Sequence, residues 1–258
     1  MRSRLDLEMT RRGLATSREG AQRLIMAGRV RVDSRPAAKP DIRVDEASQI
    51  SVIGPASDYA SRGGYKIAAA LDRFPIVVNG RDALDVGAST GGFTDVLLRR
   101  GAERVIALDV GYGQLAERLR RDPRVTVIDR TNIRHIASSD LPYRPNLVVI
   151  DTSFISLKLV LPAVVAIAAN SADIVALVKP QFEVGRGKVG KGGIVRDDSL
   201  REEALAAVIA FARSIGLEPV DTIKSPITGA AGNQEFLAHF RWKPKNQEIP
   251  PAVACGER

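Results

Sequence analysis

The sequence contains few of the residues that disulfide and metal chemistry need. It has one cysteine, Cys255, and two histidines, His135 and His239, among 258 residues. One cysteine cannot form an intramolecular disulfide, and so few thiol and imidazole groups provide no cluster for zinc. We therefore expect no disulfide framework and no metal site.

Long hydrophobic runs are also absent. The longest extends from Leu159 to Ala169, about half of the ~20 residues that a membrane-spanning helix needs. The first residues, MRSRLDLEMTRR, are charged throughout and lack the apolar core of a secretory signal. We expect a cytoplasmic protein that does not contact a membrane.

Acidic residues are outnumbered, and the formal net charge is +8. The excess is concentrated at the front, where residues 1–45 contain eleven Lys and Arg against six Asp and Glu, a net charge of +5. Such a distribution favours a polyanionic partner, although a basic surface without a partner is the alternative. Arginine dominates this segment, which favours the binding interpretation.

The front segment is predicted to be a small α+β domain over residues 1–54. A helix is expected over 16–28, and alternating strands are expected over 29–33 and 49–53. The stretch RLDLEMTRRGLATSREGAQRLIMAGRVRVDSRPAAKP resembles the S4-type RNA-binding module. The resemblance implies that basic side chains contact the phosphates of structured RNA. The residues assigned to this role are Arg4, Arg11, Arg12, Arg18, Arg23, Arg29 and Lys39, with Arg62, Lys188 and Lys191 from later in the chain.

A linker over residues 55–62, rich in small and polar residues, is expected to lead to the second domain. There, β-branched runs alternate with segments of helical period, a pattern that predicts a parallel sheet with helices on both faces. The predicted strands end in polar residues: Asp85, Asp109, Asp129, Asp151 and Lys179. Because ligands of open α/β sheets bind outside the carboxyl ends of the strands, we expect these side chains to surround one crevice.

The glycine-rich turn DVGASTGGF follows the first predicted strand of the second domain. Ser89 stands where a dinucleotide fingerprint has its second glycine, which favours a nucleoside ligand without a pyrophosphate. Asp109 is placed to accept hydrogen bonds from ribose hydroxyls. This arrangement is found in S-adenosylmethionine-dependent methyltransferases. The candidate cofactor residues are Asp85, Gly87, Ala88, Ser89, Thr90, Gly91, Gly92, Phe93, Asp109, Asp129, Thr131, Asn132 and Asp151.

A second glycine-rich stretch, GRGKVGK over 185–191, fits the P-loop pattern of nucleotide-binding proteins. However, Gly192 follows it where the P-loop needs Ser or Thr for magnesium, and no helix signal begins there. We expect a basic substrate loop instead.

The motifs SRGGYK, DTSFISL, VKPQFEVG and GNQEF, in this order around the glycine turn, resemble those of the TlyA family. Its members are ribosomal RNA cytidine 2′-O-methyltransferases, also known as haemolysins, which join an S4 domain to an FtsJ/RrmJ-type methyltransferase domain. The resemblance implies an α/β, Rossmann-like, S-adenosylmethionine-dependent methyltransferase domain over 63–245, followed by a polar tail over 246–258. It also implies a catalytic tetrad of Lys66, Asp151, Lys179 and Glu235.

In that tetrad, Lys179 is expected to act as base or proton acceptor, and Lys66 to steer the ribose and phosphate. The cofactor implied is S-adenosylmethionine, and the partner is ribosomal RNA, 16S and/or 23S, within ribosomal subunits. The sequence favours a monomer without fixing the oligomeric state. Two alternatives are a membrane-active haemolysin and an RNA-binding assembly factor without catalytic activity.

Overall fold

The computed structural model describes residues 2–15, 17–26, 29–37, 39–52, 59–185, 187–190, 192–229 and 231–244, with Arg23 described by its backbone alone. The chain divides into two compact units, residues 1–58 and 59–258. Residues 59–62, expected in the linker, pack within the second unit, where the Ala60 amide donates to the Asp95 carboxylate at 2.8 Å. Residues 55–58 and the expected tail, 246–258, lie outside the described residues.

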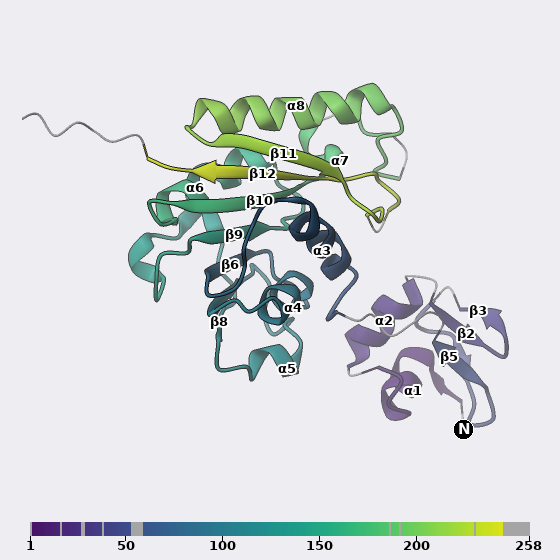
Figure 1. Cartoon of the computed structure of the whole chain (residues 1–258). Helices are drawn as coiled ribbons and strands as arrows, with labels where there is room; N and C mark the ends of the chain where they lie inside the picture. Colours follow the sequence, from purple (N-terminus) through teal and green to yellow (C-terminus); the bar gives the residue numbers. More distant parts are fainter. Residues whose placement is uncertain are drawn as a thin grey trace, which may run out of the picture. The chain divides into compact units, whose positions relative to one another are not determined.

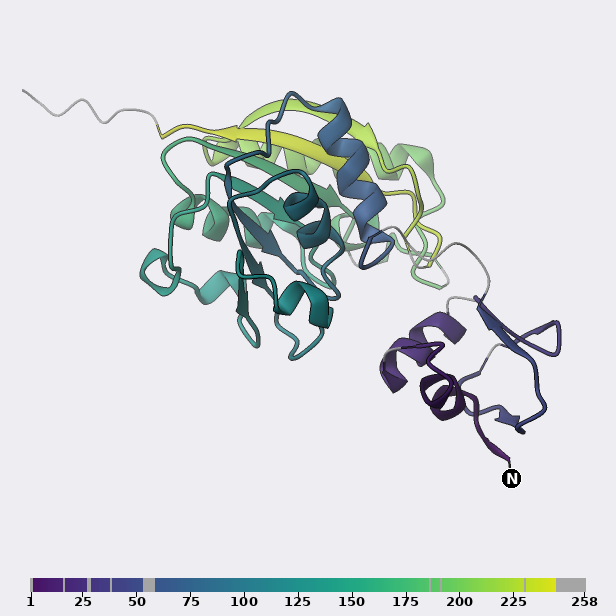
Figure 2. The same ribbon diagram turned by 60° about the horizontal axis from the view of Figure 1, so that its bottom comes forward.

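The first unit is a small α+β domain (Figures 1 and 2). Its elements are β1 (Ser3–Arg4), α1 (Leu5–Arg11), α2 (Arg18–Met26), β2 (Val30–Val32), β3 (Arg35–Pro36), β4 (Arg43–Val44) and β5 (Ile50–Val52). Strands β3, β2 and β5 form one antiparallel sheet, and β1 pairs with β4. The expected helix and both expected strands are present as α2, β2 and β5. The expected ends at positions 16, 27, 28 and 53 lie outside the described residues.

Apolar residues at helical spacing form the core of the first unit. Leu5 and Met9 of α1 pack with Ala21 and Ile25 of α2, and all four side chains are buried. The spacing of four residues places each pair on one face of its helix. Two acids of α1, Asp6 and Glu8, are also buried beside this core.

The second unit is built on a seven-stranded sheet. Its elements are α3 (Gly63–Arg73), β6 (Asp82–Val86), α4 (Gly92–Arg99), β7 (Arg104–Leu108), α5 (Glu117–Arg120), β8 (Val125–Ile128), η1 (Ile133–His135), η2 (Ser138–Asp140), β9 (Leu147–Ile150), α6 (Leu157–Ile167), β10 (Ala172–Val178), α7 (Pro180–Glu183), α8 (Asp198–Ser214), β11 (Glu218–Lys224) and β12 (Phe236–Trp242). The strand order is β11-β12-β10-β9-β6-β7-β8. The five strands β6 to β10 are parallel, as predicted, and β12 lies antiparallel between β10 and β11 (Figure 1).

Alternate residues of the parallel strands face opposite layers. In β9, Leu147 and Val149 join the hydrophobic cluster beneath α3 and α4, whereas Val148 and Ile150 join the cluster beneath α6 and α8. In Figure 2 the blue helix α3 lies in front of the sheet and the green α8 lies behind it. Because both faces are covered, the strands are mostly apolar, which explains their β-branched runs. The predicted fold class is confirmed.

Two details differ from the expected elements. Asp85 lies within β6 rather than at its end. The antiparallel hairpin β11–β12 was not expected. The chain order reverses between β6 and its neighbours β7 and β9, so the carboxyl end of β6 is the position where an open α/β sheet binds its ligand.

Candidate active site

A cavity of about 210 Å³ opens at the carboxyl end of β6. Residues from α3, the glycine turn, the end of β9 and the β11–β12 connection line it: Ser61, Arg62, Gly63, Lys66, Asp85, Gly87, Ala88, Ser89, Thr90, Gly92, Phe93, Asp151, Ile227 and Thr228. The structure therefore brings most of the predicted cofactor turn together with two of the predicted catalytic residues, Lys66 and Asp151.

The glycine turn needs its glycines for close packing. Gly87 and Gly91 have φ angles of 86° and 92°, which favour glycine. A Cβ on Gly87 would lie 2.6 Å from the carbonyl oxygen of Asp151, and one on Gly91 would lie 2.3 Å from Leu119. The sequence predicts that another group lies close to this turn. In the structure that group is the backbone of Asp151, and the contact positions the turn against the end of β9.

Asp85 is fully buried beneath this turn. Its Oδ2 accepts hydrogen bonds from the amide and the hydroxyl of Thr94, at 2.9 and 2.7 Å, so it anchors the first turn of α4. Its Oδ1 has no hydrogen-bond partner among the described residues. Burial raises the pKa of Asp85 to about 7, against the hydrogen bonds from Thr94 that lower it. A polar atom is therefore left for a ligand or water at the cavity wall.

Asp109 is connected to the turn directly. Its carboxylate accepts the Ser89 amide at 2.8 Å and the Gly111 amide at 2.7 Å. The next strand end contributes Asp129, which accepts the Gly113 amide at 3.1 Å and pairs with Arg120 at 3.2 Å. These two acids border the turn without lining the 210 Å³ cavity.

Two further predicted cofactor residues, Thr131 and Asn132, also lie outside the cavity lining. The Thr131 hydroxyl donates to the Asp129 carbonyl at 3.1 Å, and the Asn132 side chain caps η1 by accepting the Arg134 amide at 3.1 Å. Their side chains serve the local loop, and the Thr131 amide joins that loop to the Asp109 carbonyl at 3.0 Å.

The four predicted catalytic residues form two ion pairs. Lys66 Nζ lies 2.6 Å from Glu235 Oε2, and Lys179 Nζ lies 2.6 Å from Asp151 Oδ1. Only 10% of each lysine side chain is exposed. Lys66 and Asp151 line the same cavity, whereas their partners Glu235 and Lys179 do not, so each pair contributes one residue to the lining.

Strand register explains why these residues converge. Val178 pairs with Phe236, so Lys179 leaves β10 where Glu235 enters β12, at one edge of the sheet. The parallel pairing of Ala176 with Ile150 places Asp151 at the same edge. The ion pairs thus follow from the pairing of strands that are far apart in the sequence.

Comparison with known proteins decides the family. Residues 59–242 match the FtsJ-like methyltransferase family, and residues 3–50 match the S4 domain. The 16S/23S rRNA (cytidine-2'-O)-methyltransferase TlyA of Mycobacterium tuberculosis is 51% identical over 241 residues, 93% of this chain and 90% of that protein. The chain belongs to the TlyA family of FtsJ-like methyltransferases. The TlyA-family resemblance seen in the sequence is confirmed, and the chain is an enzyme of the methyltransferase class.

Two other TlyA-family relatives carry the haemolysin name. Hemolysin A of Brachyspira hyodysenteriae is 42% identical, over 92% of this chain and 99% of that protein. A solved structure of a hemolysin from Streptococcus thermophilus is 41% identical, with a TM-score of 0.75 over 97% of this chain and 92% of that one. Within the described part of this TlyA-family chain, no helix has both the length and the apolar character needed to cross a bilayer.

Several contacts in the TlyA-family site were not predicted. Ser153 accepts a hydrogen bond from Lys179 Nζ at 2.8 Å, and Arg62, assigned to RNA contact, lines the cavity and reaches the Thr228 carbonyl at 3.4 Å. Buried Asn233 accepts the Val195 amide at 2.9 Å and donates to the Gly193 carbonyl at 2.8 Å. These are contacts between distant loops, for which local patterns contain no signal.

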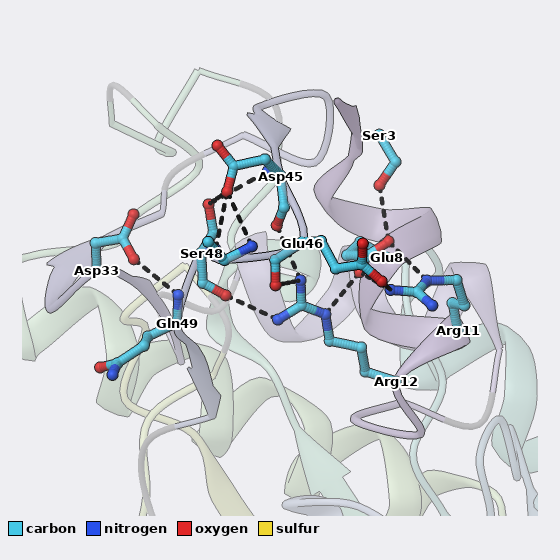
Figure 3. A network of polar contacts seen from close by, with 10 residues as sticks. Ser3, Glu8, Arg11, Arg12, Asp33, Asp45, Glu46, Ser48 and Gln49 are labelled. Atoms are coloured by element: carbon cyan, nitrogen blue, oxygen red, sulfur yellow. Dashed lines mark hydrogen bonds and ion pairs between the residues drawn. The ribbon is translucent and has the colours of Figure 1, made fainter. Parts of the chain in front are cut away.

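The basic residues of the S4 domain are held by acids that the sequence argument overlooked. Glu8 accepts from Arg11 and Arg12 at 2.6 Å each, and these guanidinium groups lower the pKa of Glu8 to about 2. Arg12 also donates to the carbonyls of Asp45, Glu46 and Ser48, at 2.9, 3.2 and 2.7 Å (Figure 3). Arg12 thus joins α1 to the turn between β4 and β5.

The remaining predicted RNA contacts have different surroundings. Lys188 lies 3.9 Å from exposed Glu203, a distance at the limit of an ion pair, and Lys39 is exposed. Lys191 and the Arg23 side chain lie outside the described residues.

Proposed function

We propose that this chain transfers a methyl group from S-adenosylmethionine to the 2′-oxygen of a cytidine in ribosomal RNA, 16S and/or 23S. The observation that supports the proposal most strongly is the convergence of the Lys66–Glu235 and Lys179–Asp151 pairs on the cavity beside the glycine turn. The M. tuberculosis relative, named as a 16S/23S rRNA (cytidine-2'-O)-methyltransferase, supports the choice of substrate. Such a substrate places the enzyme in the cytoplasm with the ribosomal subunits.

The residues of the cavity fit the cofactor. The turn from Gly87 to Gly92 lines it, the unpartnered Oδ1 of Asp85 lies at its wall, and Asp109 borders the turn with a carboxylate suited to ribose hydroxyls. S-adenosylmethionine supplies the methyl group as a sulfonium electrophile. Lys66 and Asp151 line the same cavity and are the residues proposed to face the RNA hydroxyl.

Lys179 is proposed to accept the proton of the 2′-hydroxyl as the new oxygen–carbon bond forms. Asp151, at 2.6 Å, and Ser153, at 2.8 Å, orient its amine. Lys66, held by buried Glu235, is proposed to steer the ribose and phosphate. The alternative role of Lys179 is to stabilise developing negative charge on the oxygen without taking the proton.

The reaction is tested by transfer of a tritiated methyl group to separated 30S and 50S ribosomal subunits, followed by mapping of the modified nucleotide. We expect label on the 2′-oxygen of a cytidine in one subunit or both. Absence of label from both subunits would contradict the proposal. Leakage of liposomes caused by the purified protein would instead support the membrane-active alternative.

Variants of Lys179 separate its two roles. Under the proton-accepting role, Lys179→Ala lowers the single-turnover rate by about 10²–10⁴-fold while the affinities for cofactor and RNA change little. Arginine keeps the charge but does not deprotonate, so Lys179→Arg should be as slow as Lys179→Ala. An arginine variant within a few-fold of wild type would overturn the proton-accepting role and leave the methyltransferase proposal intact.

A further inference from the structure

A fully buried carboxylate lies among the basic residues of the first unit. Asp6 has no exposed surface and stands in α1 beside the core residue Leu5. Its Oδ1 accepts from Arg4 Nε at 3.0 Å, and its Oδ2 accepts from Arg4 Nη2 at 3.1 Å. Arg18 Nε and Gln22 Nε2 also donate to Oδ2, at 3.0 and 2.8 Å. The Leu7 amide also donates to Oδ1, at 3.0 Å. The three side chains that bind Asp6 come from β1 and α2, so this carboxylate joins α1 to both elements.

Two of these partners are positively charged and partly exposed. The Arg4 side chain is 33% exposed and the Arg18 side chain is 52% exposed. Because Arg4 Nη2 and Arg18 Nε bind the same oxygen, the two guanidinium groups meet at Asp6. Their hydrogen bonds to Asp6, Arg4's above all, hold the pKa of that carboxyl well below its usual range, so it stays ionised and the trio has a net positive charge.

The N–H groups that face away from Asp6 remain for a ligand. Within the described residues, the two Nη atoms of Arg18 make no hydrogen bond. Arg12 differs, because its N–H groups are used by Glu8 and by three carbonyls of the turn over 45–48 (Figure 3). Guanidinium groups bind phosphate oxygens through paired N–H donors in one plane, and fixing their orientation beforehand reduces the entropy lost on binding.

We propose that Asp6 is a positioning residue that holds Arg4 and Arg18 together as one binding site for an RNA phosphate. The proposal rests on the proposed function, since that function supplies the RNA. The change in RNA affinity that it predicts is opposite in sign to the change expected from net charge alone. Removing an acid from a basic RNA-binding surface should strengthen binding if only net charge matters. If Asp6 positions the arginines, removing its charge should weaken binding.

The test measures binding of the full chain to separated 30S and 50S subunits as a function of salt. We expect Asp6→Asn to raise the dissociation constant about tenfold, the loss of one charge-assisted contact, and to reduce the salt slope by about one. The matched control is Glu19→Gln, an exposed acid in the first turn of α2 with no ion pair in the described part of the chain. The control should bind as tightly as wild type or slightly more tightly.

A second variant covers the case in which Asp6→Asn unfolds the first unit, which amide hydrogen exchange over residues 2–15 would reveal. Arg18→Lys preserves the net charge and changes a half-exposed side chain, but lysine lacks the planar fork that can bind Asp6 and a phosphate together. We expect several-fold weaker binding with unchanged exchange.

Wild-type affinity in Arg18→Lys, or affinity at or above wild type in folded Asp6→Asn, would overturn the proposal. Binding is measured without methyl transfer. An enzyme that binds subunits but transfers no label would therefore contradict the proposed function and leave the Asp6 comparison intact.

Discussion

At the scale of single residues, the structure separates side chains that hold the protein together from those available to a substrate. Arg12 illustrates the first kind, because only 23% of its side chain is exposed and its N–H groups bind Glu8 and three backbone carbonyls. The sequence predicts an RNA contact for Arg12, whereas its contacts in the structure hold α1 to the turn between β4 and β5. Loss of RNA binding in an Arg12 variant would therefore have to be distinguished from loss of folding.

We predict that Arg12→Ala destabilises the first unit. Three carbonyls, two of them partly buried, lose their donor, which costs about 1–3 kcal/mol of unfolding free energy. Amide hydrogen exchange over residues 2–15 and 39–52 should become faster. Arg31→Ala is the control, because Arg31 is exposed and has no ion pair in the described residues. Equal exchange in the two variants would show that the Arg12 contacts contribute little.

Asp85 makes stability depend on pH. Its folded pKa of about 7 is above the unfolded value of ~3.9, so the folded state binds more protons between these values. Stability is therefore highest below pH ~4 for this group and falls as the pH rises to about 7. Against Asp85→Asn, wild type should lose on the order of 2–4 kcal/mol of unfolding free energy across this window, at ~1.4 kcal/mol per pKa unit.

Urea unfolding followed by tryptophan fluorescence measures this difference. Trp242 in β12 is the single tryptophan of the chain, so its signal reports the second unit, which contains Asp85. Parallel pH profiles for wild type and Asp85→Asn would show that Asp85 is already ionised at pH 4 in the folded protein.

At the scale of elements, the glycine turn and the end of β9 form one assembly. Gly87 hydrogen-bonds through its amide to the Leu108 carbonyl of β7 at 2.8 Å, and its Cα faces the backbone of Asp151. The cofactor turn and the ion pair of Lys179 are therefore placed by the same contact. A shift of the turn should therefore displace Asp151.

We predict that Gly87→Ala lowers stability and activity together. The added Cβ would lie 2.6 Å from a backbone oxygen, which a side-chain rotation cannot relieve. Gly113→Ala is a matched control, since Gly113 also has a positive φ, 64°, but has nothing within 4 Å of an added Cβ. Both variants bear backbone strain of about 1–3 kcal/mol, and Gly87→Ala alone should also lose methyl transfer. Equal transfer rates in the two variants would argue against the coupling.

At the scale of the whole molecule, the two units divide the proposed work. Every residue that lines the cavity lies between Ser61 and Thr228, within the second unit. The first unit contains the Asp6 and Glu8 clusters of arginines. The proposed catalytic residues and the proposed RNA contacts therefore lie in separate segments of the chain.

We predict that residues 59–258 bind S-adenosylmethionine with nearly the affinity of the full chain and methylate ribosomal subunits far more slowly. The cavity stays intact, whereas the phosphate contacts of the first unit are lost. Calorimetry measures the first quantity, and tritium incorporation measures the second. Methylation at the full-length rate would show that the first unit is dispensable for substrate binding.

Local sequence patterns were sufficient to predict most strands and helices and the glycine turn after β6. The β-branched runs predicted β6 to β10, because strands covered on both faces are mostly apolar. The spacing of Gly87, Gly91 and Gly92 predicted a tight turn after β6, because backbone conformation is a property of a few consecutive residues. Family resemblance added Lys66, Asp151, Lys179 and Glu235 as a set, without their pairing.

Tertiary structure alone decided which charges meet. The Lys66–Glu235 pair joins α3 to β12 through strand order and register, which depend on the whole sheet. The same holds for Asp6. Among the many arginines of the first unit, Arg4 and Arg18 are bound by this buried carboxylate. Composition determined that this protein is basic and that its first unit is rich in arginine. Only folding determined which arginines are held by buried carboxylates, because burial is what makes an ion pair specific rather than one of many exposed contacts.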